Sequence, residues 1–446
     1  MDFKEKRLFI VQIPKRIASG LINALKGGVV PRTGLGYIAV GRSDEIDALL
    51  KDVAIAEDGG AFFRFIVGRY GSGKSFLLQT MRAHVTDRGF ATADADLSPE
   101  RRLCGTKGQG LATYRELMKN LSVKAKPDGG ALSLILEKWI DGVRNEVLAE
   151  GKITRDNLFF SVEVEKRIFA KINGLEDMVH GFEFATIIAE YYHGFRDGND
   201  EKQRNAIRWL RGEFSTKTEA RECLNVSTII NDENWYDYLK LMTSFLVSAG
   251  YKGLVVMIDE LVNIMKISNS VTRQYNYEKI LMMYNDVMQG KAHNLGIILG
   301  GTPQCVEDTR RGVFSYEALR SRLERGRFAT DDVKDLMSPI IRLSPLNYEE
   351  LTVLTEKLAE IHGVVFDYEP KITLEDRIFF VKAEFGRIGA DSNITPREMI
   401  RDFIELLNIA YQNPDKTIAE LMGEDEFKFA EGEGEDKADG FEDFDL

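Results

Sequence analysis

The sequence predicts an α/β fold with a parallel β-sheet, a large helical insertion and a C-terminal helical lid. Residues 60–67 form an apolar run that leads into a glycine-rich loop and then an amphipathic segment, the strand–loop–helix order of a parallel sheet. Two more apolar runs, 253–258 and 296–299, each end in a short acidic or glycine-rich turn. Stretches with helical periodicity lie between and after these runs, as expected for an α/β core.

The elements follow in order along the chain. Residues 1–30 are typical of a basic amphipathic helix that ends at Gly27-Gly28, because glycine ends helices. The expected strands are 60–67, 89–95, 253–258, 296–299 and 339–343, and the expected helical stretches are 75–87, 110–250 and 347–422.

These elements predict four parts. The boundaries are 1–36 for a basic N-terminal helical segment, 37–345 for the core with a helical insertion at about 110–250, 346–422 for the lid, and 423–446 for an acidic tail. The tail has too much charge and glycine to form a core, so we expect it to be disordered.

Composition favours a cytoplasmic protein. No apolar run is long enough to cross a bilayer, and the first residues lack the apolar stretch of a signal peptide. The three cysteines are far apart, which favours a reducing compartment and argues against both a disulfide framework and a zinc site. We therefore expect no membrane partner.

Charge is unevenly spread along the chain. The net charge is −12, of which residues 424–446 carry −9, whereas residues 1–42 carry +6. An acidic total is thus weak evidence against nucleic acid, and the basic segment favours DNA contact without sequence preference. The alternative is that this segment is a solvated helix that docks on its own core.

The glycine-rich loop carries the strongest chemical signal. Residues 68–75 match G-x-x-x-x-G-K-[ST], a pattern whose backbone N–H groups surround phosphate oxygens. Lys74 is expected to reach the β- and γ-phosphates of ATP, and Ser75 to ligate Mg²⁺. The expected cofactor contacts here are Gly68, Arg69, Tyr70, Gly71, Ser72, Gly73, Lys74, Ser75 and Phe76.

Two acids follow the strand at 253–258. Ligand sites lie at the carboxyl ends of parallel strands, so Asp259 is expected to bind the metal and Glu260 to activate water. The alternative is a pair of acids that caps the next helix. Thr302, after the strand at 296–299, is expected to orient the water, although Gly-Gly-Thr-Pro is also an ordinary turn.

Arginines gather in residues 310–327, at positions 310, 311, 320, 322, 325 and 327. The simplest interpretation is a solvated helix face. The other is an arginine finger, since a guanidinium is permanently charged and meets phosphate in a fork. Further on, Thr395, Pro396 and Glu398 are typical of a helix start, which leaves Arg397 unexplained, in a turn that could lean over the nucleotide.

The order of these features resembles that of the AAA+ ATPases. The segment VGRSDE, with Val40, Gly41 and Arg42, is similar to the adenine-side element of the initiator clade. The resemblance implies that Thr302 is the first sensor, Arg397 the second sensor, and Arg322 in Ser321-Arg322-Leu323 the finger. The 185 residues from Lys74 to Asp259 exceed a compact AAA+ core, which implies the insertion.

More closely, the chain resembles the BREX-system ATP-binding proteins of the BrxD type. The matching segments are GGVVPRTGLGYIAVGRSDEI, FRFIVGRYGSGKSF, DADLSPERRL, WLRGEF, VVMIDEL, GGTP and ITPREMIRDF. The resemblance implies a Mg²⁺-dependent ATPase in antiphage defence, with self-association and a helicase or another defence protein as partners.

Two functions remain open. One is an oligomeric motor or switch that acts on DNA, and the other is a regulatory ATPase that assembles or remodels protein partners without binding DNA. A metabolic kinase is disfavoured, since it requires an acceptor pocket instead of paired sensors and clustered arginines.

Overall fold

The computed structural model describes residues 13–151, 154–172, 178–328, 334–388 and 395–423. The chain divides into two compact units, each assembled from segments that are distant in sequence. The helical unit comprises Met1–Asp44, Gly68–Thr80 and Arg342–Leu446, and the sheet unit comprises Glu45–Val67 and Met81–Ile341. Apart from Gly423, the predicted acidic tail lies outside the described residues, as do residues 1–12 of the basic segment.

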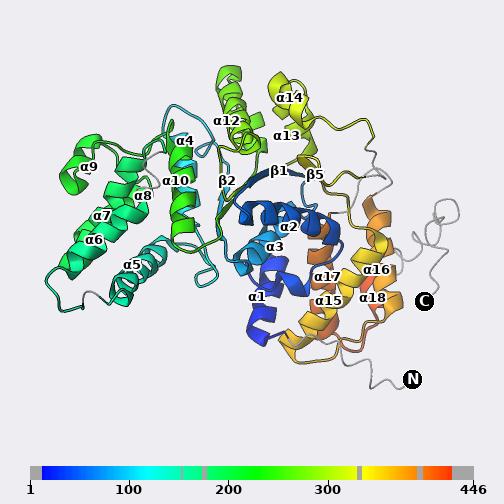
Figure 1. Ribbon diagram of the computed structural model, residues 1–446. Helices are drawn as coiled ribbons and strands as arrows, with labels where there is room; N and C mark the ends of the chain where they lie inside the picture. Colours follow the sequence, from blue (N-terminus) through cyan, green and yellow to red (C-terminus); the bar gives the residue numbers. More distant parts are fainter. Residues whose placement is uncertain (1–12, 152–153, 173–177, 329–333, 389–394, 424–446) are drawn as a thin grey trace. The chain divides into compact units, whose positions relative to one another are not determined.

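A five-stranded sheet forms the centre of the sheet unit (Figure 1). Its strands are β1 (Ala61–Val67), β2 (Ala91–Asp96), β3 (Leu254–Asp259), β4 (Leu295–Gly301) and β5 (Ile340–Arg342), in the order β2-β3-β4-β1-β5. The pairs β2–β3, β3–β4 and β4–β1 are parallel. Every residue of β3 and β4 is buried, because helices cover both faces of a parallel sheet.

The carboxyl ends of four strands meet at one edge of this sheet. Val67 of β1 pairs with Gly301 of β4, and Ile258 of β3 pairs with Leu299 of the same strand. Asp96, the last residue of β2, pairs with Asp259, the last residue of β3. Residues that follow these strands therefore start from the same edge, where parallel α/β sheets bind their ligands.

Most helices belong to the sheet unit. They are α4 (Gln109–Lys119), α5 (Leu132–Ala149), α6 (Phe160–Ile172), α7 (Gly181–Asp197), α8 (Asp200–Leu210), α9 (Lys217–Leu224), α10 (Trp235–Ser248), α11 (Val262–Met265), α12 (Ser270–Met288), α13 (Pro303–Glu307) and α14 (Glu317–Leu323). Figure 1 shows α5 to α10 gathered beyond β2, at one side of the sheet. The helices α2 (Ser43–Glu57) and α3 (Lys74–Asp87) each run from one unit into the other.

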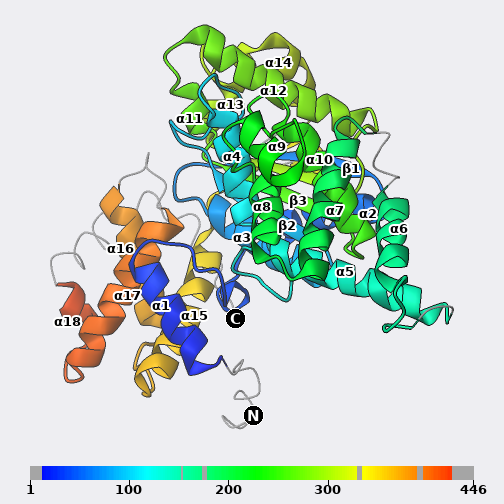
Figure 2. The ribbon, with the colours of Figure 1, turned by 90° about the vertical axis from the view of Figure 1, so that its left-hand side faces the viewer.

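The helical unit contains α1 (Lys15–Lys26), α15 (Tyr348–Phe366), α16 (Leu374–Ile388), α17 (Pro396–Gln412) and α18 (Ile418–Met422). Figure 2 shows α1 beside α15 and α17, although more than 300 residues separate α1 from them in sequence. Leu21, Leu358 and Phe403, one from each of these helices, are buried in a shared apolar core. Burial of such side chains, about 1.5–3 kcal/mol each, holds the N-terminal helix on this unit.

The five strands, and the helices inside the expected helical stretches, agree with the sequence-based expectations to within a few residues, whereas α2 and α12 lie where no helix was expected. The first helix differs, since it begins at Lys15 rather than near the N-terminus. Pro14 is its N-cap residue, and proline disfavours helical geometry in the residue before it. Within the described residues, no helix is both long enough and apolar enough to span a membrane.

Candidate nucleotide-binding site

The glycine-rich loop begins directly after β1 and runs into α3, which starts at Lys74. Gly71 and Gly73 have φ angles of 78° and 91°, in the left-handed region that favours glycine. These turns fold the backbone into a tight curve before the helix. The first N–H groups of a helix have no acceptor within the helix, so the start of α3 offers donors to an anion.

Two side chains show how the loop is held. The Lys74 Nζ atom donates hydrogen bonds to the carbonyl oxygens of Gly68 and Arg69, each at 2.9 Å. The ammonium group therefore lies within the curve of the loop. The Ser72 hydroxyl is buried without a hydrogen-bond partner among the described residues, which is unusual for a polar atom and suits a bound ligand.

Arg42 fixes the loop from a distant segment of the helical unit. Its buried guanidinium donates to the carbonyl oxygens of Ser72 at 3.0 Å and Ser344 at 2.8 Å. Val40 and Phe76 are partly buried against the apolar core that α1, α15 and α17 share in the helical unit. The sequence resemblance led us to expect Arg42 near adenine, whereas its link to the loop backbone became visible only in the structure.

Arg397 lies over the loop in the helical unit. Its Nη1 atom donates to the Tyr70 hydroxyl at 2.8 Å, and its Cζ atom is 4.9 Å from the centre of the Tyr70 ring. Thr395 caps α17 by accepting from the Glu398 backbone N–H, as the sequence indicates. A Cβ atom at Gly71 would lie 2.6 Å from the Thr395 Cβ atom, so the start of α17 touches the loop.

The two acids after β3 lie in the sheet unit. Asp259 is buried and packs on Gly300 of β4, where an added Cβ atom would overlap the carboxylate. Its Oδ1 atom accepts from the Glu260 backbone N–H at 2.8 Å. Leu261 N–H donates to the Gly300 carbonyl at 3.1 Å, which ties this turn to β4.

Asp96 is an additional acid at this edge that the sequence analysis missed. It ends β2 opposite Asp259, and Arg101 donates to its carbonyl oxygen at 2.9 Å. Burial, and after it the nearby Asp259 carboxylate, raises the pKa of Asp96 above its ordinary value. The expected strand stopped at residue 95, and an extension of one residue would have placed this acid at the strand end.

Thr302 follows β4 and is the N-cap of α13. Its hydroxyl accepts from the Cys305 backbone N–H at 3.2 Å, while its own N–H donates to the Cys305 sulfur at 3.1 Å. A threonine hydroxyl that accepts one hydrogen bond still carries a proton to donate. Gly-Gly-Thr-Pro therefore forms a turn that starts a helix, which is the structural alternative considered above. The Thr302 hydroxyl can still donate a hydrogen bond to a water molecule.

The arginines of residues 310–327 differ in the contacts that their side chains make. Arg320 pairs with Glu324 at 3.3 Å, and Arg311 donates to the Ile267 carbonyl at 3.2 Å. Arg322 is exposed on α14, where its Nη1 atom donates to the Ala318 carbonyl at 2.6 Å.

The groups of the glycine-rich loop fit the phosphates of a nucleotide. Magnesium at phosphate sites commonly uses one or two protein ligands together with phosphate oxygens; the Ser75 hydroxyl in the helical unit and the Asp259 carboxylate in the sheet unit are each, taken separately, a group of that kind. The loop offers backbone N–H groups and Lys74 for the phosphates. Ser72 provides a buried hydroxyl in the same loop.

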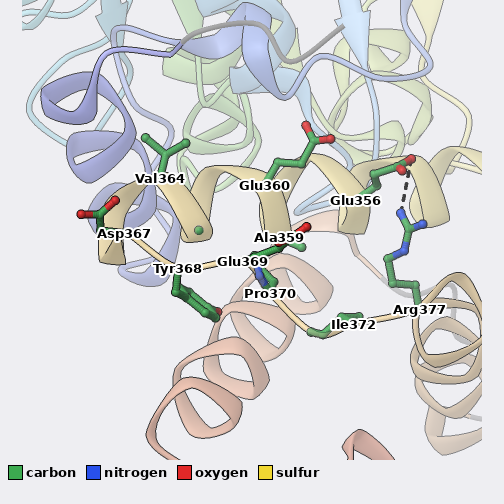
Figure 3. A pocket seen from close by; sticks show the side chains of 11 residues that line it. Glu356, Ala359, Glu360, Val364, Asp367, Tyr368, Glu369, Pro370, Ile372 and Arg377 are labelled. Atoms are coloured by element: carbon green, nitrogen blue, oxygen red, sulfur yellow. Dashed lines mark ion pairs between the residues drawn. The ribbon is translucent and has the colours of Figure 1, made fainter. Parts of the chain in front are cut away.

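A cavity of about 740 Å³ in the helical unit is a poor candidate for this nucleotide (Figure 3). Its lining includes Glu356, Glu360, Asp367 and Glu369 against one basic residue, Arg377. Arg377 is already paired with Glu356 at 3.3 Å. An acidic lining repels a triphosphate, so charge favours the glycine-rich loop instead.

Comparison with family models supports ATP as the ligand of this chain. A search of curated proteins gave no match. The family model for the BREX system ATP-binding protein BrxC/D matches residues 13–426, which is nearly the whole chain. The matched range includes the loop at 68–75 and the acids at 259–260. The chain therefore belongs to the BrxC/D family of BREX system ATP-binding proteins.

Proposed function

We propose that this chain hydrolyses ATP with Mg²⁺ and acts as an oligomeric motor or switch on DNA in BREX defence. One observation supports the ATPase part of the proposal: the strands that precede the loop, the acids and Thr302 are the adjacent strands β1, β3 and β4, which run in the same direction. The loop, the acids and the hydroxyl therefore all follow the same edge of one sheet.

In this proposal, separate residues bind the phosphates, hold the metal and activate the water. The loop N–H groups and Lys74 bind the β- and γ-phosphates, and Ser75 and Asp259 hold the metal, which neutralises phosphate charge. Glu260 accepts a proton from the attacking water, and Thr302 orients that water. This division predicts that binding and turnover can be separated by substitution.

Two arginines complete the site in this proposal. Arg397 contacts the γ-phosphate within one subunit, and Arg322 reaches the ATP of a neighbouring subunit. Support for Arg397 comes from its position over the glycine-rich loop. Support for Arg322 comes from its exposure on α14, where it is open to another chain. Assembly would then be required for fast hydrolysis.

The second candidate is a regulatory ATPase that remodels protein partners without binding DNA. Family membership is compatible with both, since a BREX system contains other proteins that can serve as partners. The two functions differ in their response to nucleic acid. A DNA-acting protein binds phosphates through basic side chains, so its DNA-stimulated rate falls as salt rises.

The test is the ATPase rate with and without double- and single-stranded DNA, at low and moderate salt, with particle mass measured in ATP. We expect ATP-dependent growth in mass and DNA stimulation that weakens with salt. Assembly without any response to DNA would support the regulatory ATPase. A monomer in ATP with full activity would contradict the oligomeric mechanism.

A further inference from the structure

Tyr70 holds an exposed position in the glycine-rich loop, with 68% of its surface accessible. A large aromatic side chain at such a site loses contact with apolar neighbours and is open to solvent. Its ring and its hydroxyl nevertheless both contact one side chain, Arg397 of α17. The pairing joins residues that are 327 positions apart in sequence, both within the helical unit.

The two contacts restrain the guanidinium in different ways. The ring attracts the cation along its face, and the Cζ-to-centroid distance of 4.9 Å lies within the range of about 6 Å for this interaction. The hydroxyl accepts one N–H at 2.8 Å and so fixes how the guanidinium plane is turned. Since a guanidinium has five N–H donors in a fixed fork, one bond to Tyr70 is compatible with a second partner.

The surroundings keep Arg397 over the loop. Thr395 packs on Gly71, the residue after Tyr70, and anchors the first turn of α17 there. A Cβ atom at Gly28, after α1, would lie 3.8 Å from the Arg397 Cδ atom, so the arginine stem passes beside that turn. Tyr70 therefore contacts the guanidinium itself, while the turn at Gly28 lies beside the arginine stem and Thr395 holds the start of α17 against the loop.

We propose that Tyr70 is the positioning residue that presents Arg397 to the terminal phosphate of ATP. The proposal rests on the function proposed above and adds a role for a loop residue whose type the loop pattern leaves open. In the proposed function the loop N–H groups and Lys74 bind only some of the oxygens of the β- and γ-phosphates, so γ-phosphate oxygens remain for a second side-chain cation. A guanidinium held in advance loses less conformational freedom on binding than a mobile one.

The test compares the affinities for ATP and ADP, since only ATP carries the group that Arg397 would contact. Equilibrium dissociation constants are measured with Mg²⁺ for the wild type and for Tyr70→Phe, Tyr70→Ala, Arg397→Ala and the double variant Tyr70→Ala/Arg397→Ala. Arg401→Ala is the control, because this arginine lies on the same helix and bonds to Asp402 instead.

We expect Tyr70→Ala to weaken ATP binding roughly five- to ten-fold, with ADP binding unchanged, which is the scale of one cation–π contact with its hydrogen bond. Tyr70→Phe keeps the ring and should fall between the wild type and Tyr70→Ala. The double variant should bind ATP no more weakly than Arg397→Ala alone, because Tyr70 acts through Arg397.

Three results would overturn the inference. Equal weakening of ATP and ADP by Tyr70→Ala would indicate a general loop effect. Additive losses in the double variant would show that the two residues act independently. Normal discrimination between ATP and ADP in Arg397→Ala would remove the arginine from the site. In contrast, a wild type that binds neither nucleotide would overturn the proposed function itself.

Discussion

Glu260 has a left-handed backbone conformation, with a φ angle of 63°. Such geometry costs a residue with a side chain about 1–2 kcal/mol, so neighbouring contacts must hold it. The Asp259 carboxylate accepts from the Glu260 N–H, and the Glu260 carbonyl accepts from the Asn263 N–H at 3.0 Å. Strain of this kind concentrates at functional sites, which supports the assignment of Glu260 to chemistry.

Gly300 tests the position of Asp259. We predict that Gly300→Ala displaces the Asp259 carboxylate, because the new methyl group would overlap it. Turnover should fall about 10- to 100-fold, the usual loss when a catalytic group moves by about 1 Å, and more Mg²⁺ should be needed for half-maximal rate. The measurement is a Mg²⁺ titration of the ATPase rate.

The control for this substitution is Gly142→Ala on α5, where a Cβ atom meets nothing within 4 Å. That variant should keep the wild-type Mg²⁺ dependence. An unchanged Mg²⁺ dependence in a folded Gly300→Ala protein would show that Asp259 does not hold the metal.

The sequence predicted site residues best where they follow a strand or fit a fixed pattern. The loop pattern and the acids after residue 258 are local signals, and the structure places them after β1 and β3. Contacts between distant segments gave no such signal. The bond from Arg42 to Ser72 and the pairing of Tyr70 with Arg397 depend on how the helical unit folds.

Among the elements, α12 shows why one helix was not anticipated. Its buried positions are regularly spaced, but apolar residues such as Val271, Tyr275 and Met282 are exposed, so the apolar residues of the helix do not form a clean stripe. Among the buried residues, Asn276 uses its side-chain oxygen to accept from the backbone N–H groups of Leu103 and Cys104. A helix that holds a loop by polar contacts has a weaker helical pattern.

The helix α15 carries a buried histidine, His362, from which we expect pH-dependent stability of the helical unit. His362 lies 2.8 Å from the Tyr368 hydroxyl and 3.2 Å from the Asn408 side-chain oxygen. Burial lowers the pKa of His362 below its ordinary value of 6.5. As the pH falls through that value, the unfolded chain takes up the proton first, so the folded state loses stability.

We predict that the wild type is less stable at pH 5.5 than at pH 7.5, and that His362→Gln reduces this difference. Urea unfolding followed at both pH values measures it. The exposed His84 supplies a control, since His84→Gln should retain the wild-type pH dependence. Equal pH dependence in His362→Gln and the wild type would contradict a role for this histidine.

At the scale of the whole molecule, both compact units are built from discontinuous segments. The glycine-rich loop belongs to the helical unit, and the acids after β3 belong to the sheet unit. Sequence patterns predicted the strands and the loop, because these are local features. The grouping of residues 68–80 with α1 and α15 follows from long-range packing, which periodicity does not encode.

At this scale we predict that the chain self-associates and that each subunit supplies Arg322 to its neighbour. If Arg322 acts on the ATP of a neighbour, a mixture of Arg322→Ala and Lys74→Ala proteins should recover part of the activity that each lacks alone. Some interfaces in the mixture combine an intact loop with an intact arginine. The measurement is the ATPase rate against mixing ratio. A normal rate for Arg322→Ala as a lone subunit would place the finger elsewhere.

The central claim is that the loop at 68–75 binds ATP while Glu260 drives its hydrolysis. The most direct measurement is ATP affinity together with turnover for Lys74→Ala and Glu260→Gln. We expect Lys74→Ala to lose tight ATP binding, because Lys74 is the residue that would contact the phosphates. We expect Glu260→Gln to keep tight ATP binding and to lose turnover, because Glu260 would act only on the attacking water. Hydrolysis by Glu260→Gln near the wild-type rate, or tight ATP binding by Lys74→Ala, would contradict the central claim.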